Sequence, residues 1–402
     1  MSPVKPLEKY TLIDLTHMLS GPYGGMLLAD LGMTTIKVEP PGTGEGTRRL
    51  LATDPENARH GMGAYFMTLN RNKKSVCIDL KSARGREVFY RLVERADVVL
   101  ENFSPGVTRR LGIDHEALSA VNPRIVSCSV SGFGHAGPAS NRPAFDMVAQ
   151  GMGGGMSITG TTPGEPLRSG IPIGDLGGGI FAAMGILSAL LARETTGRGQ
   201  HVDISMLDGQ ISLLNYMATM HLLSGRNPGP EGNGHFVHVP YNAFPTATRH
   251  IIVCCLLDQS WTALAKALGL EDLLIERYER QPGRLADRAL IEARVADVLA
   301  TRPCEHWLEI LTTARIPCAP VNDFEHALSD PQVLARNMVI EVEHPQGGAL
   351  RMPGNPIKLS DTPAETFSPP PLLGQHTDEV LRDLLALAPE QVAELRREGV
   401  VA

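Results

Sequence analysis

Asp175 is the residue whose neighbours most clearly mark it for chemistry. It lies in "GIPIGDLGGGI" (170–180), directly after one glycine and two positions before three more. Glycine inside a helix costs roughly 0.5–1 kcal/mol relative to alanine, so this cluster indicates a special backbone conformation or the close approach of another group. A carboxylate in such a setting can act as a covalent nucleophile. The simpler alternative is that Asp175 caps a helix predicted over 180–194, because aspartate accepts hydrogen bonds from a first helical turn.

Basic residues near predicted strand ends form a second candidate group. They lie in "LNRNKKS" (69–75) and "ENFSPGVTRRLG" (101–112). Open parallel sheets bind ligands at strand ends, so these residues are candidates for binding phosphates, and solvated surface charges are the alternative.

Two common nucleotide-binding motifs are not present in the sequence. The first strand-to-helix turn lacks GxGxxG, and "PPGTGEG" (40–46) lacks the Lys-Ser/Thr of a P-loop.

Metal sites and serine nucleophiles are not favoured by the other motifs. His235 and His238 form an HxxH pair, which is an incomplete metal site without a further carboxylate or cysteine ligand. No GxSxG elbow occurs in the sequence. We therefore predict no bound metal.

The elements that position these residues alternate regularly over residues 10–135. β-rich runs such as "YTLIDL" and "RIVSCSVSGFG" take turns with helical patterns such as "GPYGGMLLADLG" and "HEALSAVN". This alternation predicts βαβ units and a mainly parallel sheet covered by helices. Two longer helical patterns follow at 180–194 and 206–223. The expected fold is α/β, with a Rossmann-like large domain.

A change in composition after residue 225 indicates a second domain, because residues 226–240 are rich in Gly, Pro and Asn. We predict that 1–224 forms the first part of the large domain. Residues 225–325 form a smaller α+β domain, and 326–402 return to complete the large one.

Composition excludes several classes of partner. The 402 residues carry a formal net charge of −7, so no basic surface for nucleic acid or an anionic membrane is expected. The six cysteines form no CxxC pair and are expected to be reduced. The N-terminus lacks a secretory apolar region, and the longest apolar stretch, 180–192, is shorter than the roughly 20 residues of a membrane span. We expect a cytoplasmic protein.

Several segments together resemble the class III coenzyme A transferase family, which includes formyl-CoA transferase and carnitine CoA-transferase. The resemblance runs in order from about residue 11 to 381. The matching segments are "SGPYGGMLLADLGMTTIKVEPPG", "LNRNKKSVCIDL", "VVLENFSPGVTRRLGI", "RPAFDMVAQ", "GDLGGGIFAAMGILSALL", "TGRGQHVDISMLD" and "LGQHTDEVL".

This resemblance implies that Asp175 is a covalent nucleophile. In the family, a glycine-flanked aspartate attacks an acyl-CoA thioester, and the released thiolate converts the resulting anhydride to an aspartyl-CoA thioester. Coenzyme A thioesters are thus substrates, and no permanently bound cofactor is implied. We further expect glycines 177–179 to leave backbone N–H groups open to the developing negative charge.

The resemblance also assigns residues that contact coenzyme A. Lys74 and Arg110 are the candidates for its phosphates, because cationic side chains pair with them. Asp146 matches an acidic residue near the active site of formyl-CoA transferase, and an acid in a first helical turn is the alternative. The matching contact residues are Met18, Leu19, Ser20, Asn102, Phe103, Arg110 and Met206.

Two alternatives and two further expectations follow from the family comparison. Racemases of the same fold resemble "GHD" where this chain has "AFD", and Phe145 cannot transfer a proton. A non-catalytic acyl-CoA-binding protein would not need Asp175.

The glycine quartet of formyl-CoA transferase has no counterpart in "HVPYNAFPT" (238–246), which favours a larger acyl donor such as succinyl-CoA. The family also implies an interlocked homodimer.

Overall fold

The computed structural model describes residues 4–346 and 348–402. It contains a six-stranded sheet in the order β5-β2-β1-β6-β7-β8, in which every neighbouring pair is parallel. Counted along the chain this order is 3-2-1-4-5-6, the doubly wound arrangement of Rossmann folds. The predicted α/β class with a parallel sheet is confirmed. The strands are β1 Thr11–Asp14, β2 Thr34–Glu39, β5 Lys73–Cys77, β6 Val98–Glu101, β7 Val126–Ser131 and β8 His201–Ser205.

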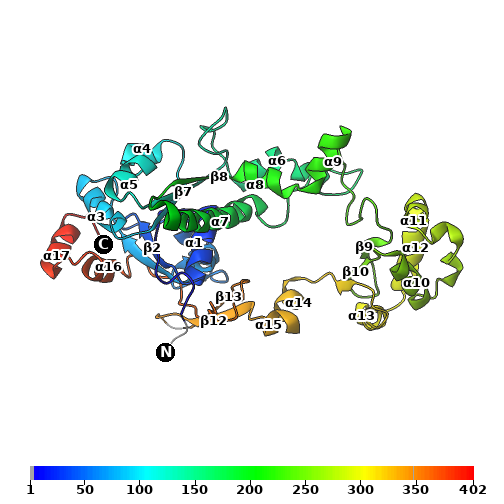
Figure 1. Cartoon of the computed structure of the whole chain (residues 1–402). Coiled ribbons are helices and arrows are strands. Elements are labelled where there is room, and N and C mark those ends of the chain that lie inside the picture. The colour runs from blue at the N-terminus through cyan, green and yellow to red at the C-terminus, as the bar shows by residue number, and fades with distance from the viewer. Residues whose placement is uncertain (1–3, 347) are drawn as a thin grey trace. The chain divides into compact units, whose positions relative to one another are not determined.

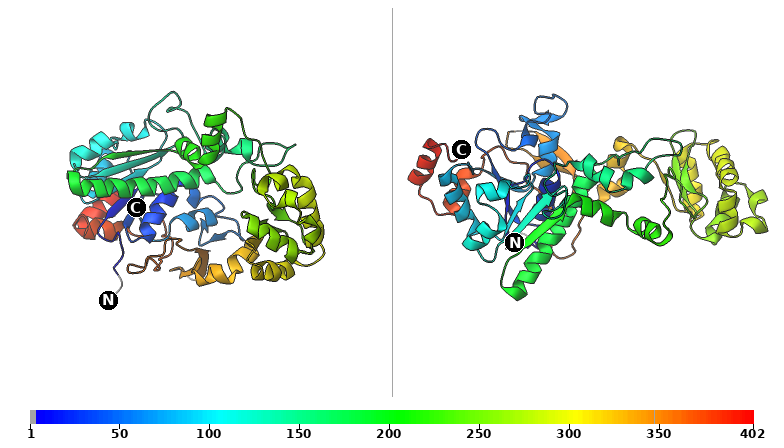
Figure 2. Two further views of the ribbon diagram at one scale, coloured as in Figure 1. Left: turned by 45° about the vertical axis from the view of Figure 1, so that its right-hand side comes forward. Right: turned by 90° about the horizontal axis from the view of Figure 1, so that it is seen from above.

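Alternating side chains of the strands supply a core on each face of the sheet, because successive residues of a strand point to opposite faces. Ile13 and Leu15 belong to one core, and Leu12 belongs to the other. Figure 2 shows α7 running along one face. The first core includes residues of α3 Ala83–Val93, α5 His115–Val121, α16 Thr377–Asp383 and α17 Pro389–Arg397. The second includes residues of α1 Ser20–Asp30 and α7 Ile173–Thr196.

Helix α7 packs closely against α1, and its glycines make this possible (Figure 1). A Cβ atom at Gly178 would lie 2.5 Å from Ser20 Oγ, and one at Gly179 would lie 2.5 Å from the Ser20 carbonyl oxygen. The helix begins at Ile173 rather than at the expected residue 180. By length and composition it is long and apolar enough to cross a membrane, but its packing in a core accounts for the same composition.

Contacts divide the chain into two compact units. The first comprises the chain up to Met156 together with Arg168–Arg226 and Asn337–Ala402. Its other elements are β3 Ala58–Arg59, β4 Met62–Gly63, α2 Ala64–Leu69, α4 Val107–Leu111, α6 Asp146–Met152, α8 Met206–Leu213, α9 Tyr216–Ser224, β12 Val339–Glu343 and β13 Ala349–Pro353.

The second unit comprises Ser157–Leu167 and Asn227–Arg336. It contains a three-stranded antiparallel sheet in the order β11-β10-β9 with its own apolar core. The predicted domains 1–224, 225–325 and 326–402 stay predictions, because compactness alone does not establish independent folding. The elements are β9 Tyr241–Phe244, β10 Ile251–Cys254, α10 Asp258–Ala267, α11 Gln281–Ala286, α12 Arg288–Leu299, α13 Cys304–Thr313, β11 Cys318–Pro320, α14 Phe324–Ser329 and α15 Pro331–Ala335.

Candidate active site

The candidate site lies where the strand order reverses, between β1 and β6. Connections leave these two strands in opposite directions, so a crevice forms at their carboxyl ends. Asn102, just after β6, bridges to the loop after β1: its Nδ2 donates to the His17 carbonyl at 2.7 Å, and its Oδ1 accepts from the His17 N–H at 2.8 Å. Asn102 therefore fixes the loop that continues into Met18, Leu19 and Ser20.

A cavity of about 650 Å³ opens beside this bridge and contains Asp175. Most of the residues predicted to contact coenzyme A line it, and Asp146 does so as well. The structure thus brings together residues from the ends of β1, β6 and β8 and from the first turn of α7. The predicted residues lining the cavity are Met18, Leu19, Ser20, Asn102, Phe103, Met206, Asp146 and Asp175.

Lys74 and Arg110 do not line the Asp175 cavity. Lys74 forms an ion pair with Glu379, with Nζ and Oε1 2.7 Å apart. Arg110 is exposed on α4. A neighbouring cavity of about 520 Å³ shares His17 and Phe103 with the Asp175 cavity and is lined in part by α4. Val107 and Leu111 of α4 line this second cavity, and Arg110 belongs to the same helix.

The first turn of α7 is capped by Asp146, not by Asp175. Asp146 Oδ1 accepts from the N–H groups of Gly174 at 2.8 Å and of Asp175 at 3.2 Å. Asp175 is the third residue of the helix, after the N-cap Pro172. The capping interpretation of Asp175 is therefore wrong. The expectation that glycines 177–179 expose open N–H groups is also wrong, because they lie inside α7, where each backbone N–H donates to the carbonyl four residues earlier. Gly178 and Gly179 instead leave room for Ser20 of α1.

Burial sets the electrostatics of Asp175. Its pKa rises to about 6, first because burial disfavours the charged form and then because Asp146 is negatively charged nearby. At pH 7 the group is mostly ionised, yet more basic than an exposed aspartate. Tyr65 lines the same cavity, and its pKa is raised by burial and by the charges of Asp175 and Asp146. The site therefore holds a basic carboxylate beside a protonated phenol.

A buried ion cluster fixes the end of β1. Lys73 Nζ lies 2.8 Å from Asp14 Oδ2, and Lys37 Nζ donates to the Thr16 carbonyl at 2.8 Å. Burial raises the pKa of Asp14, but the charges of Lys37 and Lys73 outweigh it and bring the pKa to about 2. The nearby Arg71 pairs with Asp30. Arg71 and Lys73, two basic residues of the segment 69–75, are thus held in buried ion pairs.

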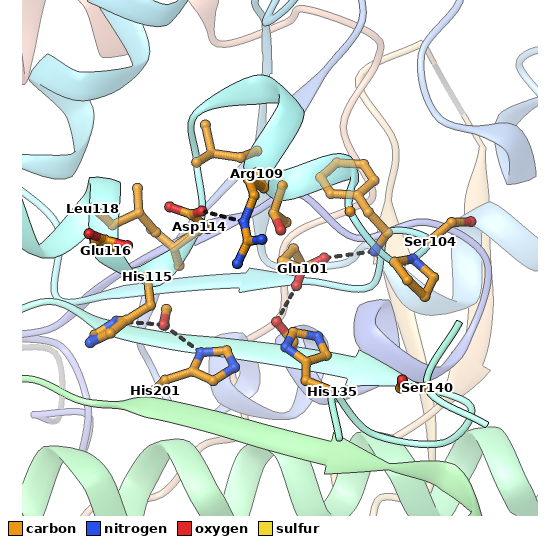
Figure 3. A pocket seen from close by; sticks show the side chains of 18 of the residues that line it. Glu101, Ser104, Arg109, Asp114, His115, Glu116, Leu118, His135, Ser140 and His201 are labelled. Carbon is orange, nitrogen blue, oxygen red and sulfur yellow. Dashed lines mark hydrogen bonds and ion pairs between the residues drawn. The ribbon is translucent and has the colours of Figure 1, made fainter. Parts of the chain in front are cut away.

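Glu101 supports the turn that presents Asn102. Its carboxylate accepts from the Phe103 N–H at 2.7 Å and from the Ser129 hydroxyl. Figure 3 shows Glu101 among the side chains that line a further cavity of about 540 Å³. In that cavity the Ser127 hydroxyl lies 2.9 Å from His115 Nδ1 and 2.8 Å from His201 Nδ1.

Metal-binding geometry is absent from the part of the chain that the structure describes: no group of three His, Cys, Asp or Glu side chains is placed to hold an ion. The HxxH pair serves a local turn instead. His235 Nδ1 accepts from the backbone N–H groups of Val237 and His238.

Comparison with known proteins identifies the family. A family model described as CoA-transferase family III matches residues 7–377. The chain belongs to this family. It is 39% identical over 374 residues to the acetyl-CoA:oxalate CoA-transferase of Acetobacter aceti, covering 92% of this chain and 94% of the relative. It is 33% identical over 406 residues to the succinyl-CoA:glutarate CoA-transferase of Homo sapiens, covering 100% and 91%.

Among solved structures, a CAIB/BAIF family protein from Brucella suis has the same fold, with a TM-score of 0.85 and 34% identity over 94% of this chain and 99% of that one. The resemblance found in the sequence is confirmed, and the chain is an enzyme that transfers CoA.

Among the polar residues of this family III cavity that sequence reasoning missed are those with a ring or guanidinium group: His17, Tyr65, Arg142 and Arg168. His17 adjoins the predicted Met18, and Arg168 lies seven positions before Asp175 in "PLRSGIPIGD". Proximity to predicted residues was thus an available signal for both. Tyr65 follows a loop and β4, and its place in the cavity depends on long-range packing.

Proposed function

We propose that Asp175 is the covalent nucleophile in a transfer of CoA from an acyl-CoA to a free carboxylic acid. The observation that carries this proposal is the position of Asp175. Its carboxylate lines the cavity at the switch point of the sheet, while Asp146 performs the capping of α7. Among the described residues, no hydrogen bond is found to the Asp175 carboxylate, so it is available to react.

The reaction proceeds through two anhydrides and one thioester. An oxygen of Asp175 attacks the thioester carbonyl, the C–S bond breaks, and CoA leaves as a thiolate. The thiolate then attacks the aspartyl carbonyl and releases the donor acid, which leaves an aspartyl-CoA thioester. The acceptor carboxylate attacks this thioester and again releases the thiolate. Attack of the thiolate on the acceptor acyl carbon forms the new acyl-CoA and regenerates Asp175.

Ser20 is a suitable hydrogen-bond donor for the oxygen that gains charge in these steps. Its side chain is 3% exposed and its hydroxyl has no partner among the described residues, although it lines the cavity. An orphaned buried hydroxyl is unusual and is explained when a ligand supplies the partner. A Cβ atom added at Gly178 would lie 2.5 Å from this hydroxyl. Gly178 lies on the same face of α7 as Asp175, because residues i and i+3 are neighbours on a helix.

We also propose that coenzyme A extends from the Asp175 cavity into the adjoining cavity of about 520 Å³. The two share His17 and Phe103, and Pro40, Pro41 and Leu111 supply apolar surface in the second. Such surface suits an adenine ring. Arg110 and Lys74 stay the candidates for the phosphates, and binding through Lys74 requires exchange of its pairing with Glu379.

For the substrates we propose dicarboxylic acids, with succinyl-CoA as the donor. This rests on relatives named for oxalate and glutarate, which are both dicarboxylates. The alternative activity of an acyl-CoA racemase lacks a proton-transferring group where Phe145 lines the cavity. Incubation of a 2-methylacyl-CoA in heavy water should therefore give no enzyme-dependent deuterium at C2. Exchange at a catalytic rate would establish racemisation instead.

A homodimer is proposed from the family and from exposed apolar side chains. Ile180, Met184 and Leu191 form one exposed stripe on α7, since their spacing of four and seven places them on one face. Leu222 and Leu223 on α9 are more than 80% exposed. Sedimentation velocity should give a dimer that persists at nanomolar concentration, and a folded monomer at that concentration would contradict the proposal.

The proposed function is tested by combining a substrate panel with an Asp175→Ala variant. Mass spectrometry of acyl-CoA donors mixed with carboxylic acids should reveal transfer by the wild type. Asp175→Ala should lower kcat by several powers of ten, as expected for removal of a covalent nucleophile. Hydroxylamine added during wild-type turnover should convert the peptide carrying Asp175 to a hydroxamate. Full activity of Asp175→Ala with no trapped peptide would overturn the mechanism.

A further inference from the structure

We propose that Arg168 binds the distal carboxylate of a dicarboxylic acyl group and so selects dicarboxylic substrates. This inference rests on the proposed function of the Asp175 cavity and names the residue that would set its substrate class. Arg168 lines that cavity and its side chain is exposed. Among the described residues, its guanidinium donates only to the neighbouring Ser169 carbonyl, with Nη1 3.2 Å from the oxygen, and forms no ion pair with a carboxylate.

The charged side chains of the cavity are compatible with such a partner. Asp146 and Asp175 are carboxylates, and Arg142 and Arg168 are the guanidinium groups that line the same space. A dicarboxylic substrate keeps one negative charge after its other carboxyl group has reacted. A free guanidinium offsets the repulsion from the two aspartates, and its planar fork can hold that remaining carboxylate with two hydrogen bonds.

A chain of hydrogen bonds fixes the backbone beside Arg168 relative to Asp175. The Ser169 N–H donates to Gln150 Oε1 at 2.9 Å, and Gln150 Nε2 donates to Asp146 Oδ2 at 2.7 Å. The other oxygen of Asp146 accepts from the first turn of α7, which carries Asp175. Gln150 is buried. The base of the Arg168 side chain is therefore tied to the turn that holds the nucleophile.

Arg142 is placed differently in the same cavity. Its guanidinium lies over the Phe133 ring, 5.3 Å from the ring centre. No comparable hydrogen-bond chain of the described residues connects its backbone to Asp175. We therefore assign to Arg168 the selection of acyl groups whose distal carboxylate lies at a fixed distance from the reacting carboxyl group. Arg142 contributes only a general attraction for anions.

The test compares succinyl-CoA with butyryl-CoA, which has the same chain length and lacks the distal carboxylate. For Arg168→Gln, kcat/KM with succinyl-CoA should fall about 10- to 100-fold, the range expected for a hydrogen bond to a charged group. The value for butyryl-CoA should change less than about threefold. Arg168→Lys should recover part of the loss. Arg198→Gln, an exposed arginine outside the cavity, should leave both values unchanged.

The outcomes separate this inference from the proposed function. Equal loss for both CoA esters in Arg168→Gln, or a wild-type preference for butyryl-CoA, would overturn the role of Arg168 while leaving CoA transfer intact. A selective loss of succinyl-CoA activity in Arg142→Gln and not in Arg168→Gln would overturn the assignment to Arg168. Transfer that survives in Asp175→Ala would instead remove the proposed mechanism, whatever the specificity.

Discussion

Replacing Asp175 with asparagine should stop CoA transfer and, at the same time, stabilise the folded protein at neutral pH. Burial and the charge of Asp146 raise the pKa of Asp175 from 3.8 to about 6. The ionised carboxylate is therefore less favourable in the folded protein than in the unfolded chain. The resulting cost in stability appears as pH rises through 3.8 and is complete above a pH of about 6.

The magnitude follows from the two pKa values. A pKa difference of about 2 units between the folded and unfolded protein lowers the free energy of unfolding by about 3 kcal/mol at pH 8, since one unit is worth about 1.4 kcal/mol. At pH 5 Asp175 is mostly protonated in the folded protein, and the same linkage gives a smaller cost in stability, about 1.5 kcal/mol. The stability advantage of Asp175→Asn over the wild type should therefore grow by about 1.5 kcal/mol between pH 5 and pH 8.

Urea unfolding of both proteins from pH 5 to pH 8 measures this difference. Asp175 lies in one of two compact units, so the relevant transition is the one in which that unit unfolds, alone or together with the other. Asp361→Asn, at an exposed position of the same unit, serves as the control and should show no such growing advantage. A constant difference across this pH range, or a variant less stable than the wild type at pH 8, would refute the reasoning.

Two further variants test the surroundings of the nucleophile. Asp146→Asn removes the charge that helps to raise the pKa of Asp175, so the acidic limb of the kcat/KM profile should move to lower pH; a limb that stays in place would contradict this. Asn102→Ala removes both hydrogen bonds to His17 and should raise KM for acyl-CoA roughly tenfold, measured by steady-state kinetics. An unchanged KM would show that the loop after β1 does not need this bridge.

The sequence was a good guide to the local elements of the fold. The alternation in "VSCSVS" is that of β7, in which Val126, Cys128 and Val130 face the core shared with α7. The order of the strands could not be predicted in this way, because it depends on contacts between distant segments. For example, α16 and α17 pack into the same core as α3, although they are about 300 residues away in the sequence.

The sequence also identified most of the site but not the roles of its charges. Lys73 and Lys74 are adjacent and chemically identical, yet one is buried against Asp14 and the other pairs with Glu379 on the protein surface. This difference follows from the alternating faces of β5, which place the two side chains in different surroundings. The capping role of Asp146 depends on the approach of α6 to α7, which local patterns do not encode.

The most direct test of the central claim follows isotopic oxygen through one turnover. When the acceptor acid carries ¹⁸O in both carboxylate oxygens, its attack on the aspartyl-CoA thioester leaves one labelled oxygen on Asp175 after the thiolate removes the acyl group. Mass spectrometry should then find the peptide containing Asp175 heavier by about 2 Da, and no other peptide changed. Formation of the acceptor CoA ester with no label on that peptide would contradict a covalent role for Asp175.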